Sequence, residues 1–442
     1  MPSLDAALPA LTLSDAADAI AARYLSAADL AEAELARVRE TEPVLHAFAC
    51  LDPARVRRVA AESALRKGLL QGIGIGVKDV IDTADLPTEV GTPLMAGRRP
   101  GRSAACVERL EAAGGYVFGK TVTTAFAFLD PGATTNPWNP AHTPGGSSSG
   151  SAAAVAAGVV TGALGTQTNG SVIRPAAFCG VVGFKPTVGL LDFTGVHVFS
   201  ATFDTLGTFT RTVRDAARLA SVLAPASAIA PLPGAQPQAP RLAFLSAFPW
   251  CAPNAEAADV LAAAAVRLRM QGAVVTPVSF PDAWGDAHRI HRLIMLYEGA
   301  RALAALQAAH RAQFSPMVNA ALDEGHAIAE PEYRAALAHR EQAIEYFTEW
   351  LAPYDAVIAP PATGAAPRGL ASTGDPGCCT MWSLTGFPAL SLPIGFDAAG
   401  LPLGLQLAAA SHRDDALLAT ASWCETALGF APRIAPVQAR GA

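Results

Sequence analysis

The sequence predicts an α/β fold in which one β-sheet is covered by helices on both faces. From Ser14 to about Lys67 apolar residues recur at helical spacing, and further on helix-like and strand-like segments alternate. The segment 151–165, SAAAVAAGVVTGALG, is apolar on every side, so as a helix it must be central. The late segments YDAVIAPPA and LTGFPALSLPIGF read as strands that return to the same sheet, which argues against independent domains.

The elements follow from local patterns. Ser14 and Ser26 are placed to cap helices in the lead-in. GIGIGVKDVIDT reads as a glycine-rich approach to a buried strand, and SAACVERLEAAGGYVFGKT reads as helix, glycine stop and strand. A Pro/Ala-rich connector covers residues 229–241, followed by a strand, a helix and a strand, and by several long helices over residues 283–350.

Composition limits the classes of function. Of 442 residues, 51% are hydrophobic and 16% are charged, so much surface is buried internally or against a second copy of the chain, which makes a homodimer one possible assembly. A net charge of −6 with no run of five basic residues gives no electrostatic footprint for nucleic acid. We expect a small-molecule partner.

Cysteine usage and hydropathy indicate the compartment. The seven cysteines are scattered without CxxC spacing, which predicts reduced thiols and no structural metal. The first twenty residues lack the pattern of a signal peptide, and the longest apolar run is too short to span a membrane. We therefore expect a cytoplasmic protein that does not bind membranes.

One almost uncharged stretch stands out. Between Asp130 and Lys185 the only formal charge is Arg174, and this stretch contains TPGGSSSGSAAAVAAG followed by GTQTNGSVIRPAAFCGVVGFKPT. Such a run cannot be a solvated loop, yet it holds too many glycines and hydroxyls for an ordinary core. We infer a buried reaction centre.

Three simpler interpretations of the serine-glycine tract fit poorly. A G-x-S-x-G match at residues 146–150 would make Ser148 a nucleophile on a strand-to-helix elbow, but PAHTPG before it is not strand-like and no histidine partner is evident. A phosphate-binding loop lacks its lysine. A flexible linker is opposed by the apolar flanks.

The motifs GIGIGVKDVIDTADLPTEVGTP, GKTVTTAFAF, NPWNPAHTPGGSSSGSAAAVAAG, GTQTNGSVIRPAAFCGVVGFKPT and LTGFPALSLPIGF occur in the order typical of the amidase signature family, which this chain closely resembles. The resemblance implies one α/β/α domain, residues 1–442, around a large mixed sheet. Within it we expect a helical lead-in (1–70), a catalytic signature core (72–215), a variable substrate-specificity region (240–370) and a return to the core (371–442).

The resemblance also assigns catalytic roles. Carried over by motif, Lys78, Ser147 and Ser171 form a Ser-Ser-Lys triad with Ser171 as the nucleophile, and the Gly146–Ser147 peptide is expected to be cis. The backbone N–H groups of residues Thr168, Asn169, Gly170 and Ser171 are expected to form the oxyanion hole.

Lysine can act as the base in such a triad only when neutral. The ordinary lysine pKa of about 10.4 must therefore fall by a few units, which desolvation among Ile75, Val77 and Val80 would achieve. Lys78 would then take a proton from Ser171 through Ser147 and return it to the leaving amine. Activity is therefore expected to rise toward alkaline pH.

The chain departs from the family pattern at two places near the nucleophile. Asn169 stands where relatives commonly have glycine; asparagine tolerates left-handed conformations, and its side chain would narrow the pocket. Arg174 lies three residues after Ser171 rather than two. It either pairs with a carboxylate such as Asp204 or binds a carboxylate or carbonyl of the substrate, which points to small acidic amides.

Other side chains are expected to define the substrate cleft. Phe126 and Trp382 are candidates to line it, together with Phe128 and Phe209, although aromatic residues in such segments more often belong to the core. The helices over 283–350 are expected to set specificity, and no histidine is assigned a catalytic role.

The sequence thus predicts a cofactor-independent, metal-independent amidase that cleaves linear amides through a serine acyl-enzyme and releases ammonia or an amine. Hydrolysis of esters, carbamates or aryl amides by the same triad is one alternative. An A-type component of a tRNA-dependent amidotransferase is another, and a catalytically inactive binding module is disfavoured because all three triad positions are filled.

Overall fold

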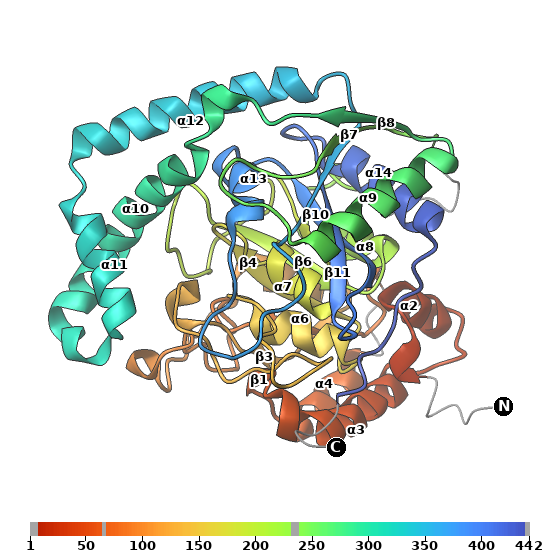
Figure 1. The fold of residues 1–442 in the computed structure, drawn as a ribbon. Coiled ribbons are helices and arrows are strands. Elements are labelled where there is room, and N and C mark those ends of the chain that lie inside the picture. The colour runs from red at the N-terminus through yellow and green to blue at the C-terminus, as the bar shows by residue number, and fades with distance from the viewer. Residues whose placement is uncertain (1–7, 64–67, 231–237, 438–442) are drawn as a thin grey trace.

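A computed structural model of the chain describes residues 8–63, 68–230 and 238–437 (Figure 1). Part of the predicted connector, residues 231–237, lies outside the described residues. Within the described part, one eleven-stranded sheet runs through the centre and takes strands from both halves of the chain.

The strand order is β1-β3-β2-β4-β6-β5-β10-β11-β9-β7-β8. Strands β2, β3 and β4 pair in parallel, as do β7, β8 and β9, while the pairs between these two groups are antiparallel. The predicted mixed sheet is therefore confirmed. The strands are β1 Phe48–Cys50, β2 Gly74–Lys78, β3 Tyr116–Thr121, β4 Gly162–Gln167, β5 Val182–Lys185, β6 Thr205–Thr210, β7 Arg241–Leu245, β8 Val274–Val278, β9 Ala356–Ala359, β10 Ala389–Phe396 and β11 Pro402–Ala408.

Helices cover both faces of the sheet, as expected. One face packs against α6 (Ser149–Ala156) and α7 (Ile173–Cys179), with α3 (Ala27–Leu45) and α4 (Pro53–Ser63) beside them. The other packs against α5 (Ala105–Ala112), α8 (Val213–Leu223), α9 (Ala255–Met270) and α14 (Asp414–Leu428). Shorter elements are α2 (Leu13–Ala21), α13 (Thr380–Leu384) and six 3₁₀ turns, Leu8–Ala10, Pro93–Met95, Ala125–Ala127, Asp282–Trp284, Arg311–Gln313 and Gly377–Cys379, among the described residues.

Two local predictions need correction. The apolar segment 151–165 is not one helix: α6 ends at Ala156, Gly158 adopts a positive φ of 69°, and β4 begins at Gly162. A left-handed residue cannot continue a helix, so the second half of the segment enters the sheet. Ser26 caps α3 as predicted, but Thr12 rather than Ser14 caps α2, by accepting a hydrogen bond from Asp15 N.

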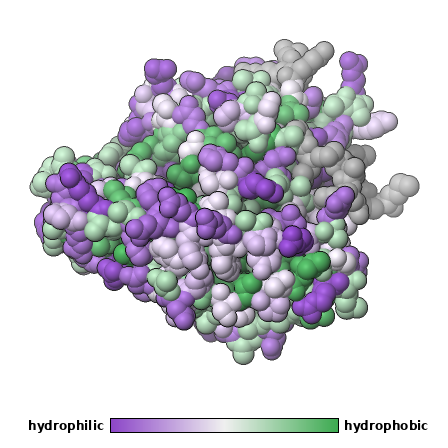
Figure 2. Space-filling model, turned by 90° about the horizontal axis from the view of Figure 1, so that it is seen from above, coloured by the Kyte–Doolittle hydropathy of each residue, from purple (hydrophilic) through white to green (hydrophobic). Residues whose placement is uncertain are grey.

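Three long helices extend beyond the sheet on the left and top of Figure 1. They are α10 (Ala287–His310), α11 (Pro316–Ala327) and α12 (Glu330–Leu351), and α10 packs against α11, α12 and α13. No helix among the described residues is long and apolar enough to cross a membrane. Hydrophobic and hydrophilic residues are interspersed over the face that Figure 2 shows.

Candidate active site

Lys78 is the last residue of β2, a strand that pairs with β3 on one side and with β4 on the other. The side chain of Lys78 is fully buried. Its Nζ is hydrogen-bonded to Ser147 Oγ at 2.7 Å and to Thr166 Oγ1 at 2.7 Å. Burial lowers the pKa of Lys78 to about 7, against the opposing effect of the negative charge of Asp204. The amine is therefore neutral in a large fraction of molecules at neutral pH.

The serine-glycine tract places Ser147 against this amine. The Gly146–Ser147 peptide bond is cis. Glycine is required on the far side of the tract: a Cβ at Gly150 would lie 2.2 Å from Ala47 O, so no other residue fits without displacing backbone. Ser148 Oγ donates to Thr166 O at 3.1 Å, which ties the tract to the end of β4.

Ser171 lies in the loop between β4 and α7, where it is 9% exposed and lines a cavity of about 110 Å³. The side chain of Gln167 shapes this loop because its Oε1 accepts hydrogen bonds from Val172 N at 2.8 Å and Ile173 N at 3.0 Å. The cavity is also lined by Ala127, Phe128, Leu129, Thr168, Asn169, Gly170, Arg174, Phe199, Met295, Thr373, Gly374 and Pro376.

A larger depression of about 580 Å³ lies elsewhere on the surface, over α3. It is lined by residues such as Asp29, Arg37 and Glu40 and includes none of the predicted catalytic side chains. The smaller cavity is the candidate active site because it combines a nearly buried serine with convergent polar groups.

The backbone N–H groups of Asn169, Gly170 and Ser171 face no hydrogen-bond acceptor among the described residues. All three residues line the cavity. Asn169 is not one of the described residues with positive φ, so the predicted left-handed turn is not used there. Its side-chain Oδ1 instead accepts a hydrogen bond from Thr380 Oγ1 at 3.0 Å.

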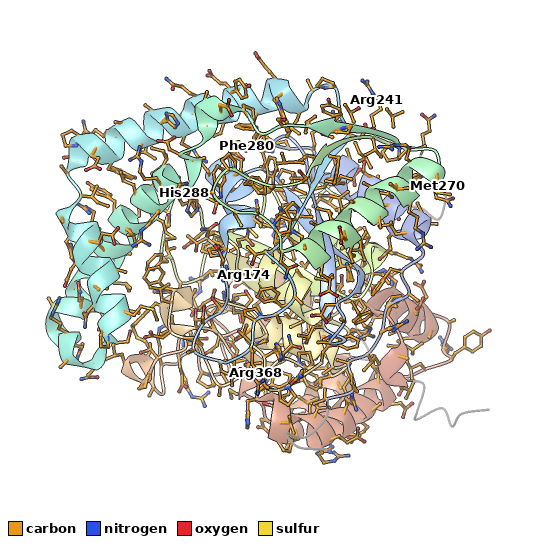
Figure 3. All side chains as sticks on the ribbon, in the orientation of Figure 1. Arg174, Arg241, Met270, Phe280, His288 and Arg368 are labelled. Atoms are coloured by element: carbon orange, nitrogen blue, oxygen red, sulfur yellow. The ribbon has the colours of Figure 1, made fainter. Side chains whose placement is uncertain are left out.

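Arg174 is buried at the centre of the molecule (Figure 3). Its Nη2 donates to Gly146 O at 2.8 Å and to Thr373 Oγ1 at 3.0 Å, whereas Nε and Nη1 have no partner among the described residues. The suggested pairing with Asp204 does not occur. Asp204 accepts from Thr168 Oγ1 at 2.5 Å, from Phe199 N at 2.6 Å and from Ser200 N at 3.0 Å.

Two aromatic candidates lie in the core instead of the cavity wall. Phe126 is 2% exposed and stacks on Phe314 with ring centroids 5.1 Å apart. Trp382 is fully buried and packs edge-on against Phe248 with ring centroids 6.2 Å apart. Phe128, two residues after Phe126, takes the position in the cavity wall.

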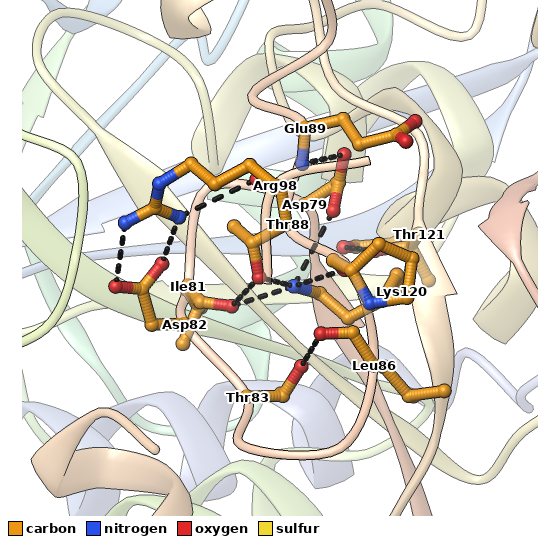
Figure 4. Close-up of polar contacts among 12 residues, drawn as sticks. Asp79, Ile81, Asp82, Thr83, Leu86, Thr88, Glu89, Arg98, Lys120 and Thr121 are labelled. Carbon is orange, nitrogen blue, oxygen red and sulfur yellow. Dashed lines mark hydrogen bonds and ion pairs between the residues drawn. The ribbon is translucent and has the colours of Figure 1, made fainter. Parts of the chain in front are cut away.

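A second buried lysine stabilises the segment that follows Lys78 (Figure 4). Lys120 Nζ donates to Ile81 O at 2.7 Å and to Thr88 Oγ1 at 2.5 Å, and lies 3.3 Å from Asp79 Oδ1. Asp79 Oδ2 accepts from Glu89 N at 3.0 Å. Lys120 thus has a buried carboxylate partner, whereas the Lys78 amine, within the described part of the chain, contacts hydroxyl and carbonyl oxygens.

The sequence patterns alone did not indicate two further contacts of this site. Thr166 binds the amine of Lys78, and Thr373 binds the guanidinium of Arg174. Thr166 is the penultimate residue of the buried strand β4, two residues before the oxyanion loop, and this position is the sequence signal that could have suggested it. Among the described residues, no group of three or more His, Cys, Asp or Glu side chains is arranged to hold a metal ion.

Comparison with known proteins gives the class of this protein, a hydrolase that acts on carbon–nitrogen bonds. The sequence model of the family described as Amidase matches residues 29–418. The chain belongs to the amidase family.

Individual relatives agree with this assignment. The chain is 32% identical over 468 residues to a putative amidase, AmiD, from Mycobacterium bovis, with 99% of this chain and 98% of the relative covered. It is also 32% identical over 469 residues to the A component of glutamyl-tRNA(Gln) amidotransferase from Roseiflexus castenholzii, with 92% and 94% covered. The solved structure of native peptide amidase from Stenotrophomonas maltophilia matches with a TM-score of 0.82 at 29% identity, covering 97% and 99% of the two chains.

Proposed function

We propose that this amidase cleaves linear carboxylic amides through an acyl-enzyme on Ser171, with Lys78 as the base and Ser147 as the relay. The observation that carries the proposal is the buried amine of Lys78, which lies 2.7 Å from Ser147 Oγ and forms no ion pair with any carboxylate that the structure describes. A pKa of about 7 leaves a lone pair on Nζ available to accept a proton.

In the first half-reaction the proton of Ser147 moves to Lys78 while Ser147 takes the proton of Ser171. Ser171 Oγ then attacks the amide carbon, and the carbonyl oxygen becomes an oxyanion that the N–H groups of Asn169, Gly170 and Ser171 stabilise. The carbon–nitrogen bond breaks as the proton returns to the leaving nitrogen, which departs as ammonia or an amine. A water molecule, deprotonated by the same path, cleaves the acyl-enzyme and regenerates Ser171.

Labelling with a fluorophosphonate tests this proposal. We expect one adduct, mapped to Ser171 by mass spectrometry, and none in the variant Ser171→Ala. Ser149→Ala is the matched control because Ser149 belongs to the same tract but donates only to Val122 O, at 3.3 Å. An adduct on Ser148, or equal labelling of Ser171→Ala, contradicts the assignment.

The acyl side of the substrate is proposed to be small and acidic. The cavity holds about 110 Å³ and is lined by Arg174, whose buried Nε and Nη1 have no partner among the described residues. A buried guanidinium gains most from an anionic or hydrogen-bonding partner, which a carboxylate on the substrate supplies in bidentate form.

The ratio of rates on acidic and neutral amides tests the role of Arg174. Arg174→Gln is expected to lower the rate on acidic amides more than on neutral ones of equal size. The ratio is the useful quantity because Arg174 also binds Gly146 O, so its replacement loosens the triad for every substrate. An unchanged ratio removes Arg174 from substrate recognition.

Two other activities use the same machinery. Hydrolysis rates on amides, esters, carbamates and aryl amides with the same acyl group distinguish an enzyme restricted to amides from one that hydrolyses acyl compounds in general. Only the leaving group differs among these substrates. Ammonia release by the isolated chain from simple amides, without tRNA or glutamine, excludes a role as the A component of an amidotransferase.

A cytoplasmic location and a homodimer stay predictions that fractionation and sedimentation can check.

A further inference from the structure

Three consecutive carbonyl groups in the oxyanion loop are each held by a hydrogen-bond donor. Thr168 O lies 3.1 Å from His291 Nε2, Asn169 O accepts from Ser383 Oγ, and Gly170 O accepts from Arg174 N at 3.0 Å. The C=O and N–H bonds of a trans peptide point in opposite directions. When a donor binds each carbonyl, the N–H group of the same peptide points away from that donor. These N–H groups belong to residues 169 to 171.

The N–H groups on the opposite side are those without acceptors among the described residues, at Asn169, Gly170 and Ser171. Buried N–H groups are rarely left unpaired. Three in succession, next to a nearly buried serine and lining one cavity, form a preorganised site for an oxygen that gains negative charge. The orientation of these N–H groups depends on the three donors that bind the carbonyls, from His291, Ser383 and Arg174.

His291 is the donor that comes from outside the signature core. It belongs to α10, is 1% exposed, and stacks on Phe203 with ring centroids 4.3 Å apart and planes at 13°. A carbonyl oxygen only accepts, so Nε2 carries the proton. Burial lowers the pKa of His291 to about 4, so the ring is a neutral donor across the pH range in which Lys78 changes its charge.

Two further contacts make α10 a fixed support rather than a loose cover. His291, Met295 and Glu298 are spaced four and three residues apart, which places them on one helix face. Met295 lines the cavity. Glu298 accepts from Ser200 Oγ at 2.5 Å and from Thr202 N at 3.0 Å, which ties α10 to the loop before β6.

The same loop carries Asp204, which accepts from the hydroxyl of Thr168 at 2.5 Å. Thr168 is therefore held at its side chain by Asp204 and at its carbonyl by His291. Because the hydroxyl and the carbonyl of Thr168 are both hydrogen-bonded, the peptide group between Thr168 and Asn169, which includes Asn169 N–H, has little freedom to rotate.

We propose that His291 is a positioning residue for the oxyanion hole, which acts through the carbonyl of Thr168 to aim Asn169 N–H at the developing oxyanion. The inference rests on the proposed acyl-enzyme at Ser171. It assigns to the helical region an indirect share in catalysis, through the orientation of the oxyanion loop.

Two replacements at residue 291 separate positioning from packing. His291→Phe keeps an aromatic ring to stack on Phe203 but cannot donate, whereas His291→Gln keeps an N–H donor. His288→Phe is the matched control, because His288 lies one turn earlier on α10, is exposed, and stacks on Trp250 away from the loop (Figure 3).

We expect His291→Phe to lower kcat on an activated aryl ester or amide by about 10- to 100-fold with KM nearly unchanged, since one oxyanion donor is worth about 10²–10³ in kcat and a misdirected one loses part of that. His291→Gln should recover most of the loss, and His288→Phe should match the wild type. The rate of fluorophosphonate labelling at Ser171 should follow kcat in all four proteins.

The outcomes distinguish this inference from the proposed function. If the wild type is labelled at Ser171 and His291→Phe reacts equally fast, or if only KM changes, the positioning role is wrong while the acyl-enzyme stands. If His291→Gln is as slow as His291→Phe although both retain the wild-type unfolding temperature, donation to Thr168 O is not the cause. If the wild type is not labelled, both proposals fail together.

Discussion

The signature core and the helical region α10–α12 differ in how they use charge. Between Asp130 and Lys185 the core has a single formal charge, and many of its polar side chains are buried. The helices place ion pairs at the surface, as between Arg292 and Glu324 or between Arg311 and Asp323. The comparison teaches that the proposed reacting groups come from a buried core, while α10 contributes single side chains, such as His291 and Met295, that reach inward from one face.

The largest expected effect comes from removing the buried amine. Lys78→Met should lower kcat by about 10²- to 10⁴-fold, because general base catalysis is worth that much. The unfolding temperature should change little, because methionine fills similar space and the burial penalty of the amine disappears. Steady-state kinetics and thermal unfolding check both parts, and near-normal kcat in this variant removes lysine from the mechanism.

Lys120, which has a buried carboxylate partner, should behave in the opposite way. Lys120→Met leaves Asp79 buried without its cation, so we expect a loss of about 3–5 kcal/mol in the free energy of unfolding. The kcat per folded, labelled active site should stay close to that of the wild type. Denaturant titration measures the free energy of unfolding. A Lys120→Met variant that is stable but has little activity would contradict the assignment of a structural role to Lys120 and a catalytic role to Lys78.

A smaller change should follow from widening the cavity on the helical side. Met295→Ala removes a side chain that lines the cavity and leaves the three predicted catalytic residues in place. We expect the preference in kcat/KM to shift by about tenfold toward acyl chains longer by one or two carbons, as for pockets that gain space for a methylene. A series of acyl amides of increasing length checks this, and an unchanged preference assigns acyl selection to the core alone.

The smallest effect should be a shift in the pH profile. Lys78 has a pKa lowered to about 7, so the rate should be low where the amine is protonated and rise as pH increases through that value. The charge of Asp204 opposes this lowering, so Asp204→Asn should move the midpoint of kcat/KM to lower pH. A midpoint that moves to higher pH contradicts the electrostatic link between the two groups.

The sequence predicted the fold class, the mixed sheet and the family because long motifs occur in a fixed order. The resemblance to the family placed Lys78 and Ser147 in one predicted triad, and their side chains are hydrogen-bonded at 2.7 Å; their catalytic roles stay a prediction. Core side chains were harder to assign. Phe126 and Ala127 have positive φ values of 55° and 57°, and this turn sends Phe126 into the core and leaves Phe128 at the cavity.

The contribution of α10 could not be predicted for a different reason. Its histidine has no partner within its own segment, and the contact with Thr168 joins residues 123 positions apart. Only the packing of α10 against the loops of the core brings them together. Arg174 is an intermediate case: its lack of a charged partner nearby in sequence suggested a substrate role, but the free Nε and Nη1 became evident only with the coordinates.

The most direct test of the central claim is the titration of Lys78 itself. The chain contains four lysines, so selective ¹⁵N-lysine labelling gives few NMR signals, and the one lost in Lys78→Met is assigned to Lys78. This assignment is needed because burial also lowers the pKa of Lys185 to about 7. The account predicts that the Lys78 amine titrates near pH 7; titration near the ordinary lysine value of about 10.4 would contradict it.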